Sequence, residues 1–119
     1  MRGIEFGTPG QFREELNALV LTGKKKATAG LFDWDYVAEN ENIETVGERL
    51  AVLNTSGDPI AIIEVVKVEE RTFSEVSDEF ALAEGEGDLS GDDFRQSHFK
   101  YWTRMGHEIK SDTKIVLVY

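Results

Sequence analysis

The sequence predicts an α+β fold, because amphipathic helices and short apolar strands follow one another in an order that offers few crossovers suited to parallel pairing. That order is helix, strand, loop, two strands, two helices and a final strand. With 119 residues and 40% hydrophobic side chains, the chain is long enough to bury one core and is too apolar to be disordered. We therefore expect a single domain over residues 1–119.

The first helix is predicted from both of its ends. Thr8-Pro9-Gly10-Gln11 combines a capping hydroxyl, a proline at the first helical position and a glutamine three residues after the cap. Apolar side chains then recur on one helical face, and Gly23 provides the positive φ that ends a helix. Thr28 favours a strand after this turn.

Two β-rich runs in the middle of the chain predict a hairpin. Glu48 to Asn54 and Ile60 to Glu69 are separated by the turn residues Thr55-Ser56-Gly57-Asp58-Pro59. Glu64 interrupts the second run and is expected on its solvated face, although a carboxylate in a barrel mouth would be a catalytic candidate.

The loop from Leu31 to Glu44 alternates aromatic and acidic residues, which predicts a short strand or a flap. Phe32, Trp34 and Tyr36 are its aromatic members. Two roles stay open for these rings, because planar side chains both plug the end of a barrel and stack on a ligand base.

The last third of the chain predicts two helices and a central strand. Ser77 caps a short helix that runs to Glu84, and Ser90 with Asp93 forms a capping box for the next helix. One face of that helix is read chiefly as core, and its members are Phe94, His98, Tyr101, Trp102 and Met105. Ile115 to Tyr119 is apolar on both faces, as central strands are.

The composition limits which partners and cofactors the chain is expected to bind. The 23 acidic and 13 basic side chains give a net charge of -10, which repels long RNA over most of the surface. The absence of cysteine excludes disulfides and cysteine-type zinc sites, and the two histidines lie outside metal-ligand spacing, so we expect no metal and no cofactor. Without a membrane-length apolar run or a signal-peptide region, the sequence predicts a soluble cytoplasmic protein that does not contact a membrane.

The stretch from Leu21 to Gly30 holds three lysines and two threonines between glycines. On a regular strand Lys24, Lys26 and Thr28 would share one face, whereas a tight turn or bulge at the glycine would bring Lys25 beside Thr28. A partly desolvated amine next to a hydroxyl can accept its proton and create a nucleophile. The alternative is a solvated lysine cluster, which is where lysines usually lie.

Gly23, Lys25 and Thr28 fall in register on Gly-x-Lys-x-x-Glu/Thr-x-Arg, and the chain thereby resembles the ASCH family of PUA-like β-barrel domains. Gly30 departs from the pattern, because many members carry arginine there. The resemblance continues through residues 46–48, 54–67 and 79–88 and on to Arg95 and His98, so it covers nearly the whole chain. It implies a small, mainly antiparallel PUA-like β-barrel flanked by helices.

The resemblance also implies an activity. Similar members include small bacterial amidohydrolases that remove the acetyl group from N4-acetylcytidine, a small nucleoside substrate. In them the motif lysine and threonine act with a glutamate at the end of the helix after the hairpin, and these positions correspond here to Lys25, Thr28 and Glu84. In an alternative alignment the family glutamate corresponds to Glu86 instead of Glu84. The alternative for both glutamates is that they are solvent-exposed loop residues with no catalytic role.

Further positions are candidates for substrate binding. Backbone amides near Gly23 or Gly30 are candidates for stabilising an oxyanion, and aromatic rings, including Trp102, for stacking on a pyrimidine. His98 has an alternative role as a hydrogen-bonded core histidine. The substrate-binding set is Gly23, Trp34, Tyr36, Glu86, Arg95 and His98.

A binding module is the competing class of function. ASCH and PUA-like domains are associated with RNA, and some ASCH proteins resemble nucleases, so a module that binds or cleaves short single-stranded RNA is an alternative. A domain that binds a modified nucleoside without turning it over is another. The net charge and the glycine at position 30 both weaken phosphate binding, and the sequence leaves the oligomeric state open.

Overall fold

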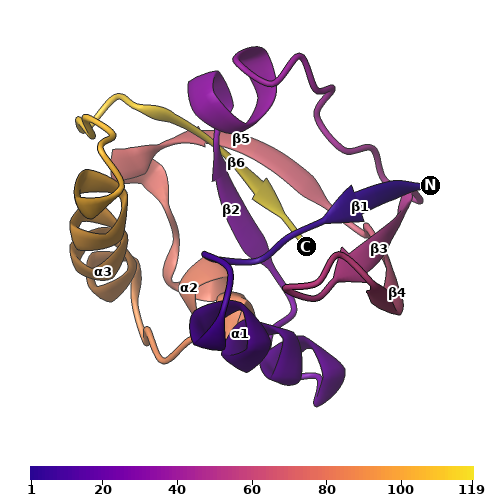
Figure 1. The fold of residues 1–119 in the computed structure, drawn as a ribbon. Coiled ribbons are helices and arrows are strands. Elements are labelled where there is room, and N and C mark those ends of the chain that lie inside the picture. The colour runs from indigo at the N-terminus through magenta and orange to yellow at the C-terminus, as the bar shows by residue number, and fades with distance from the viewer.

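The computed structural model describes all residues 1–119 as two three-stranded sheets with three α-helices (Figure 1). The first sheet has the order β1 (Arg2–Ile4), β3 (Arg49–Leu53), β4 (Pro59–Glu64), and the second has the order β2 (Thr28–Leu31), β6 (Lys114–Val118), β5 (Val68–Thr72). The helices are α1 (Gln11–Leu21), α2 (Asp78–Glu84) and α3 (Gly91–Arg104). The α+β class and the predominance of antiparallel pairing are confirmed.

The first sheet contains the predicted hairpin and one strand that the sequence did not predict. β3 and β4 pair antiparallel, and the turn between them is closed by Asp58 N, which donates to Asn54 Oδ1 at 2.9 Å. β1 is the only parallel strand, with Gly3 opposite Ala51. A strand of three residues is too short to show a period of two.

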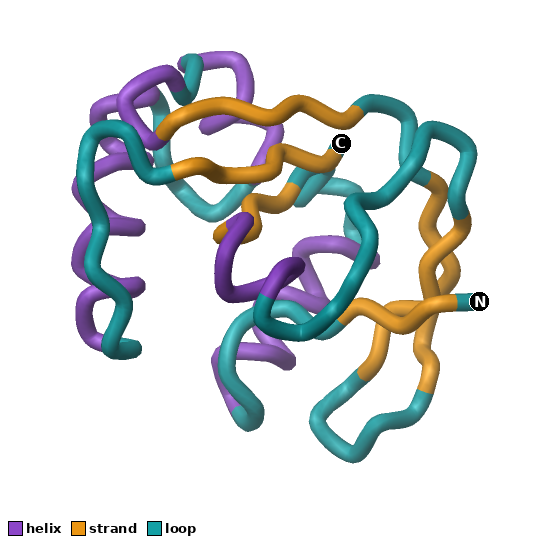
Figure 2. The backbone as a smooth tube through the Cα atoms, turned by 90° about the horizontal axis from the view of Figure 1, so that it is seen from above, coloured by secondary structure: helices purple, strands orange, loops and turns teal.

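The run Ile60 to Glu69 is two strands rather than one, so this prediction was wrong in its extent. The chain changes sheets between β4 and β5: Val65 N donates to Glu48 O at 2.9 Å, and Val66 N donates to Tyr119 O at 2.8 Å. The two sheets are therefore joined along this side, while β1 and β2 on the other side are not paired (Figure 2). A cavity is lined by residues of both of those strands.

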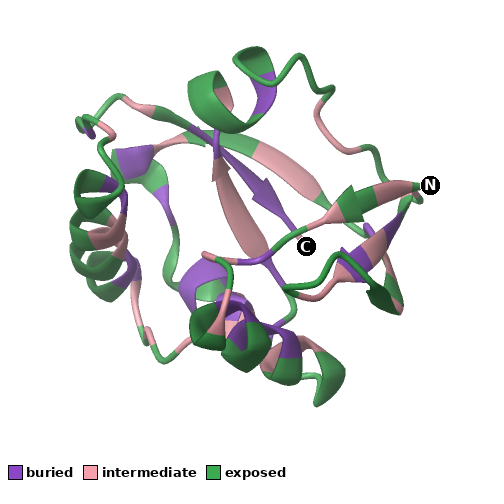
Figure 3. Cartoon of the chain, in the orientation of Figure 1, coloured by how far each residue is buried: buried purple, intermediate pink, exposed green.

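The main core lies between the second sheet and helices α2 and α3. Phe80, Phe94 and Ile115 are completely buried there, and each such side chain contributes about 1.5–3 kcal/mol through burial. A second cluster, which includes Leu50 and Val116, fills the space between the sheets. Figure 3 shows buried residues along β6 and on the inner sides of the helices, and the central position predicted for the last strand is confirmed.

The three α-helices differ in how their N-termini are capped. Ser77 Oγ accepts from Phe80 N and Ser90 Oγ accepts from Asp93 N, both at 3.1 Å, which confirms the predicted starts of α2 and α3. Helix α1 instead begins after Gly10, whose φ is 105°, without a side-chain cap, so Thr8 is not its cap.

The buried face of α1 is partly polar. Arg13 and Asn17 are buried beside Leu16. Arg13 donates to the carbonyl oxygens of Phe6 and Gly7 at 3.1 and 3.0 Å. Periodicity of apolar residues cannot show such positions, because these polar side chains are buried through hydrogen bonds to backbone carbonyls.

The loop after β2 folds as a π-helical turn, Phe32–Val37, instead of the predicted short strand or flap. Tyr36 points inward and is buried, whereas Trp34 is 51% exposed. Tyr36 therefore takes the plugging role that was one of the two roles considered for these rings. No helix in the chain combines the length and apolar character needed to cross a membrane.

Candidate active site

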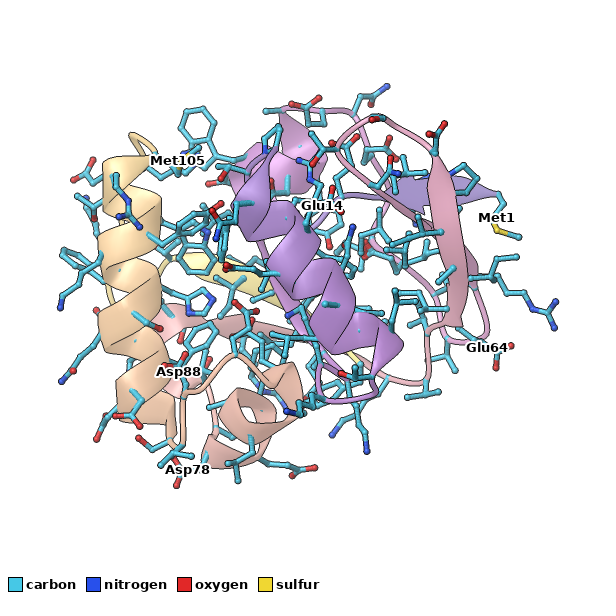
Figure 4. The ribbon with its side chains drawn as sticks, turned by 60° about the horizontal axis from the view of Figure 1, so that its bottom comes forward. Met1, Glu14, Glu64, Asp78, Asp88 and Met105 are labelled. Carbon is cyan, nitrogen blue, oxygen red and sulfur yellow. The ribbon has the colours of Figure 1, made fainter.

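A polar cavity of about 260 Å³ lies between α1, the start of β2, the segment after α2 and helix α3. Figure 4 shows the side chains that fill the space between α1, where Glu14 is labelled, and α3, beside which Asp88 is labelled. Both aromatic and charged side chains line this cavity. Its polar and charged lining includes Lys25, Thr28, Glu84, Glu86, Asp88, Ser97 and His98.

Lys25 is buried, and only 2% of its side chain is exposed. Its ammonium donates to Glu86 Oε2 at 2.6 Å, to Ala27 O at 2.8 Å and, at 3.5 Å, to Glu84 O. Lys24 and Lys26 are exposed. The solvated cluster considered as an alternative thus describes two of the three lysines and not the third.

The inward position of Lys25 follows from the turn after α1. Gly23 adopts a φ of 80°, and the amides of Lys24 and Lys25 both donate to Leu19 O at 3.0 Å. Lys26 N then donates to Ala83 O at 2.7 Å, which fixes this segment against the end of α2. The side chains alternate after the turn, so that Lys25 points inward between two exposed neighbours.

Gly85 makes the contact between the two segments possible. Its φ is 68°, and a Cβ at this position would lie 2.0 Å from Lys24 O and 2.9 Å from Lys25 Cα. Both are backbone atoms that cannot move aside independently. Glycine is therefore the residue that lets Glu84 and Glu86 approach Lys25.

The two glutamates differ in their surroundings. Glu84 is only 1% exposed, and its Oε1 has no hydrogen-bond partner. Glu86 is partly buried, and burial together with the charge of Glu84 raises its pKa, against the opposing effect of Lys25. Glu86 consequently holds a proton more readily than an ordinary glutamate.

His98 lies opposite Glu84 on helix α3. Its ring stacks on Phe94 with the centroids 3.8 Å apart, and its Nε2 lies 3.4 Å from Glu84 Oε1. Burial alone would lower the pKa of His98, but the close contact with Glu84 and the charges of Glu84 and Glu86 outweigh it and raise the pKa above its usual range.

Asp88, in the loop between α2 and α3, is the third member of a cluster with Glu84 and His98. Its Oδ2 lies 3.9 Å from His98 Nδ1 and accepts from Ser97 Oγ at 2.8 Å. One donor atom each from Glu84, Asp88 and His98 lies within 4.8 Å of the others, which is close enough to share a cation. In the structure the three side chains contact one another directly, with Nε2 of His98 facing Glu84 and Nδ1 facing Asp88, so they form one polar cluster.

Thr28 is half-buried at the start of β2 and lines the same cavity as Lys25. No hydrogen bond joins its hydroxyl to the Lys25 amine. Thr28 also lines a second cavity of about 410 Å³ between β1 and β2. It therefore lies where the two cavities meet.

Four of the predicted substrate-binding residues do not line the polar cavity. Gly23 is at the exposed turn, and Trp34 stacks outside on His107 with the centroids 4.8 Å apart. Arg95 donates to Ser74 O and Val76 O at 3.3 and 2.9 Å, where it stabilises the loop before α2.

Tyr36, the fourth, lines the second cavity and donates to both Glu44 carboxylate oxygens at 2.9 Å. A Cβ on Gly30 would lie 3.1 Å from Tyr36 Cε2. A side chain at position 30 would press against this ring, which would have to shift by a few tenths of an ångström.

The sequence interpretation missed part of the lining. Phe12 from α1 and Tyr101 from α3 meet edge to face at the cavity, with ring centroids 5.7 Å apart. Both were assigned to apolar helix faces, and no local pattern distinguishes a ring on a cavity wall from one in the core. Asp88, in the loop before α3, and Ser97, in the middle of α3, were also missed, because a polar residue in a loop or on a helix carries no local sign of a cavity.

Fold and cavity together define a small PUA-like α+β domain with a buried polar site. The family model for the ASCH domain matches residues 3–118, and the chain belongs to this family. A solved ASCH domain from Lactobacillus crispatus JV V101 is 31% identical, with a TM-score of 0.82 over 99% of this chain and 76% of that chain. Protein EF3133 from Enterococcus faecalis V583 is 28% identical, with a TM-score of 0.83 over 99% of this chain and 73% of that one. No curated protein matches the chain.

Proposed function

We propose that the protein is an amidohydrolase that removes the acyl group from N4-acetylcytidine-type nucleosides and releases cytidine and a carboxylate. Membership of the ASCH family establishes the domain and not the reaction. The observation that supports the reaction is the buried Lys25 ammonium, 2.6 Å from Glu86, in a cavity that Thr28 and Glu84 also line. Buried ionisable groups that share a cavity are typical of sites for proton transfer.

The proposed first step prepares the nucleophile. Glu86 accepts a proton from Lys25, and its raised pKa favours this transfer. The neutral amine then accepts the proton of the Thr28 hydroxyl as the oxygen attacks. The contact between these two groups must tighten when substrate binds, as catalytic hydrogen bonds often do.

The covalent steps follow from this nucleophile. Thr28 Oγ bonds to the acyl carbon, the carbon–nitrogen bond breaks, and the Lys25 ammonium returns a proton to the departing N4 nitrogen, which gives cytidine and an acyl-threonine ester. Glu84 then removes a proton from a water molecule whose oxygen attacks the ester. The ester bond to Thr28 Oγ breaks, Glu84 passes its proton to that oxygen, and the proton on Glu86 returns to Lys25. The products are the carboxylate, whose own proton goes to solvent, and free Thr28. The Gly30 side of Thr28 faces a cavity and is the side from which a backbone amide can stabilise the oxyanion.

The aromatic walls support a planar substrate. Phe12, Tyr101 and Trp102 line the cavity together with the charged groups. Flat rings bury much area against a pyrimidine and leave its edge free to hydrogen-bond. These rings take the stacking role that the sequence had placed partly on Trp34 and Tyr36.

The test is a panel of N4-acylated cytidines and short RNAs incubated with purified protein, in which both deacylation and RNA cleavage are followed. We expect deacylation, its loss in Lys25→Ala, and its retention in the matched variant Lys26→Ala, because Lys26 is the exposed neighbour. Equal activity of the Lys25→Ala and Lys26→Ala proteins would contradict the proposed site.

RNA binding without turnover is the second candidate, and the exposed Lys24 and Lys26 favour it, because they provide positive charge near the site. In that case the wild-type protein would deacylate nothing and would bind short single-stranded RNA with a steep salt dependence. The acidic surface opposes this alternative.

A further inference from the structure

We propose that His98 is a positioning residue that holds the buried Glu84 carboxylate through its Nε2 proton, and that Asp88 and Ser97 fix the opposite side of its ring. This inference rests on the proposed function for its kinetic consequences, but not for the pairing itself. It replaces the role of substrate contact that the sequence assigned to His98.

The need for a partner arises from the burial of Glu84. A carboxylate that is 1% exposed and has an oxygen without a hydrogen-bond partner is costly unless a positive group faces it. Lys25 does not meet this need, because its ammonium contacts the backbone oxygen of Glu84 and the carboxylate of Glu86. His98 Nε2, 3.4 Å from Glu84 Oε1, is the nitrogen that can do so.

The orientation of the ring shows where its protons lie. Nδ1 is 3.1 Å from Phe94 O, and because a carbonyl only accepts, Nδ1 carries a proton. If Nε2 were unprotonated, its lone pair would face the lone pairs of Glu84 Oε1 in a buried environment. A proton on Nε2 converts this repulsion into a charge-assisted contact.

The ring has little freedom to turn away. It lies between Phe94, at a centroid distance of 3.8 Å, and Trp102, at 5.0 Å. Ser97 Oγ is 3.2 Å from Nδ1 and donates to Asp88 Oδ2 at 2.8 Å. The serine thus links the ring to a second carboxylate on the side away from Glu84.

The charges that surround His98 favour its protonated form. The end of α2 contributes the carboxylate of Glu84, the loop after α2 contributes those of Glu86 and Asp88, and the segment before β2 contributes Lys25, which is paired with Glu86. Arg104, on α3 itself, lines the same cavity.

The lining from the loop after β1 and from α1 carries no charge. It consists of Phe6, Gly7, Phe12 and Leu16. In agreement with this geometry, the pKa of His98 is raised in spite of its burial.

The first experiment measures the pairing without any substrate. Long-range proton–nitrogen NMR of the ¹⁵N-labelled protein reports the protonation of each ring nitrogen, and His107→Gln assigns the two histidines. We expect His98 to carry two protons at pH 7 and its titration midpoint to fall by about 1 to 3 units in Glu84→Gln. A neutral His98 ring at pH 7, or a midpoint that Glu84→Gln leaves unchanged, would overturn the proposal.

The second experiment separates positioning from substrate contact. In His98→Gln and His98→Asn we expect kcat for deacylation to fall about 100-fold with little change in KM, because a displaced carboxylate affects the reaction and not the binding. His107→Gln is the control that removes the other histidine. A raised KM with unchanged kcat would make His98 a substrate contact and refute positioning. A wild type that deacylates nothing would refute the proposed function, while the NMR result would still decide the pairing.

Discussion

Replacing Gly85 by alanine should separate the two segments that form the candidate site. The new Cβ would lie 2.0 Å from Lys24 O and 2.6 Å from Lys24 C, and both atoms belong to the backbone. To remove this overlap, the loop must move away from the Lys24–Lys26 segment. The hydrogen bond from Lys26 N to Ala83 O and the contact between Lys25 and Glu86 would lengthen with it.

The expected loss of stability has two parts. Alanine in the left-handed region, which Gly85 occupies at a φ of 68°, costs about 1–2 kcal/mol. Loss of one backbone hydrogen bond adds about 0.5–1.5 kcal/mol. We therefore expect a decrease of about 1.5–3.5 kcal/mol in the free energy of unfolding, before any cost of exposing the Lys25–Glu86 pair.

Gly57→Ala is the matched control, because Gly57 has a φ of 86° but no atom within 4 Å of its Cβ position. It should therefore show the conformational cost alone. Urea unfolding of both variants measures the difference, and deacylation rates measure the effect on the site. A Gly85→Ala protein no less stable than Gly57→Ala, with full activity, would show that the close approach does not hold the site together.

Three further predictions concern the site and the stability of the domain. Lys25→Ala, Thr28→Ala and Glu84→Gln should each abolish deacylation, and the combined variants should be no worse than the single ones in rate measurements, because one catalytic unit fails as a whole. Activity should survive dialysis against a chelator; loss of activity that zinc restores would contradict this. The pKa of Glu48 is lowered from its ordinary 4.5 by hydrogen bonds from Arg2, so this pair stabilises the fold above that pH and the contribution disappears as the pH falls through the lower folded value. Urea midpoints of Glu48→Gln should accordingly depend less on pH in this acid range than those of the wild type.

The elements predicted correctly are those whose signals are local. Ser77 and Ser90 cap their helices because a side-chain hydroxyl needs only the amide three residues ahead. The turn at residues 55–58 likewise depends on its own residues. The strand break at Val65 to Lys67 depends instead on pairing with Glu48 and Tyr119, which are distant in sequence, so a single β-rich run concealed it.

The candidate site was predictable where the family motif gave fixed spacing. Lys25, Thr28 and Glu84 all line one cavity, although their catalytic roles remain predictions. Arg95 and Trp34 were placed there from residue type alone, and the structure instead pairs Arg95 with loop carbonyls and Trp34 with His107. Residue type indicates which chemistry is available, but long-range packing decides which side chains share a cavity.

Three unfavourable features of the fold meet at this cavity. A buried ion pair such as Lys25–Glu86 contributes little net stability, because desolvation offsets the attraction. Glu84 buries an oxygen without a hydrogen bond, and Gly85 occupies a conformation that few residues tolerate. An apolar cluster like the one around Phe80 would stabilise the same space more effectively. Local violations of this kind concentrate where a chain is selected for activity rather than for stability, and here they surround the groups assigned to proton transfer.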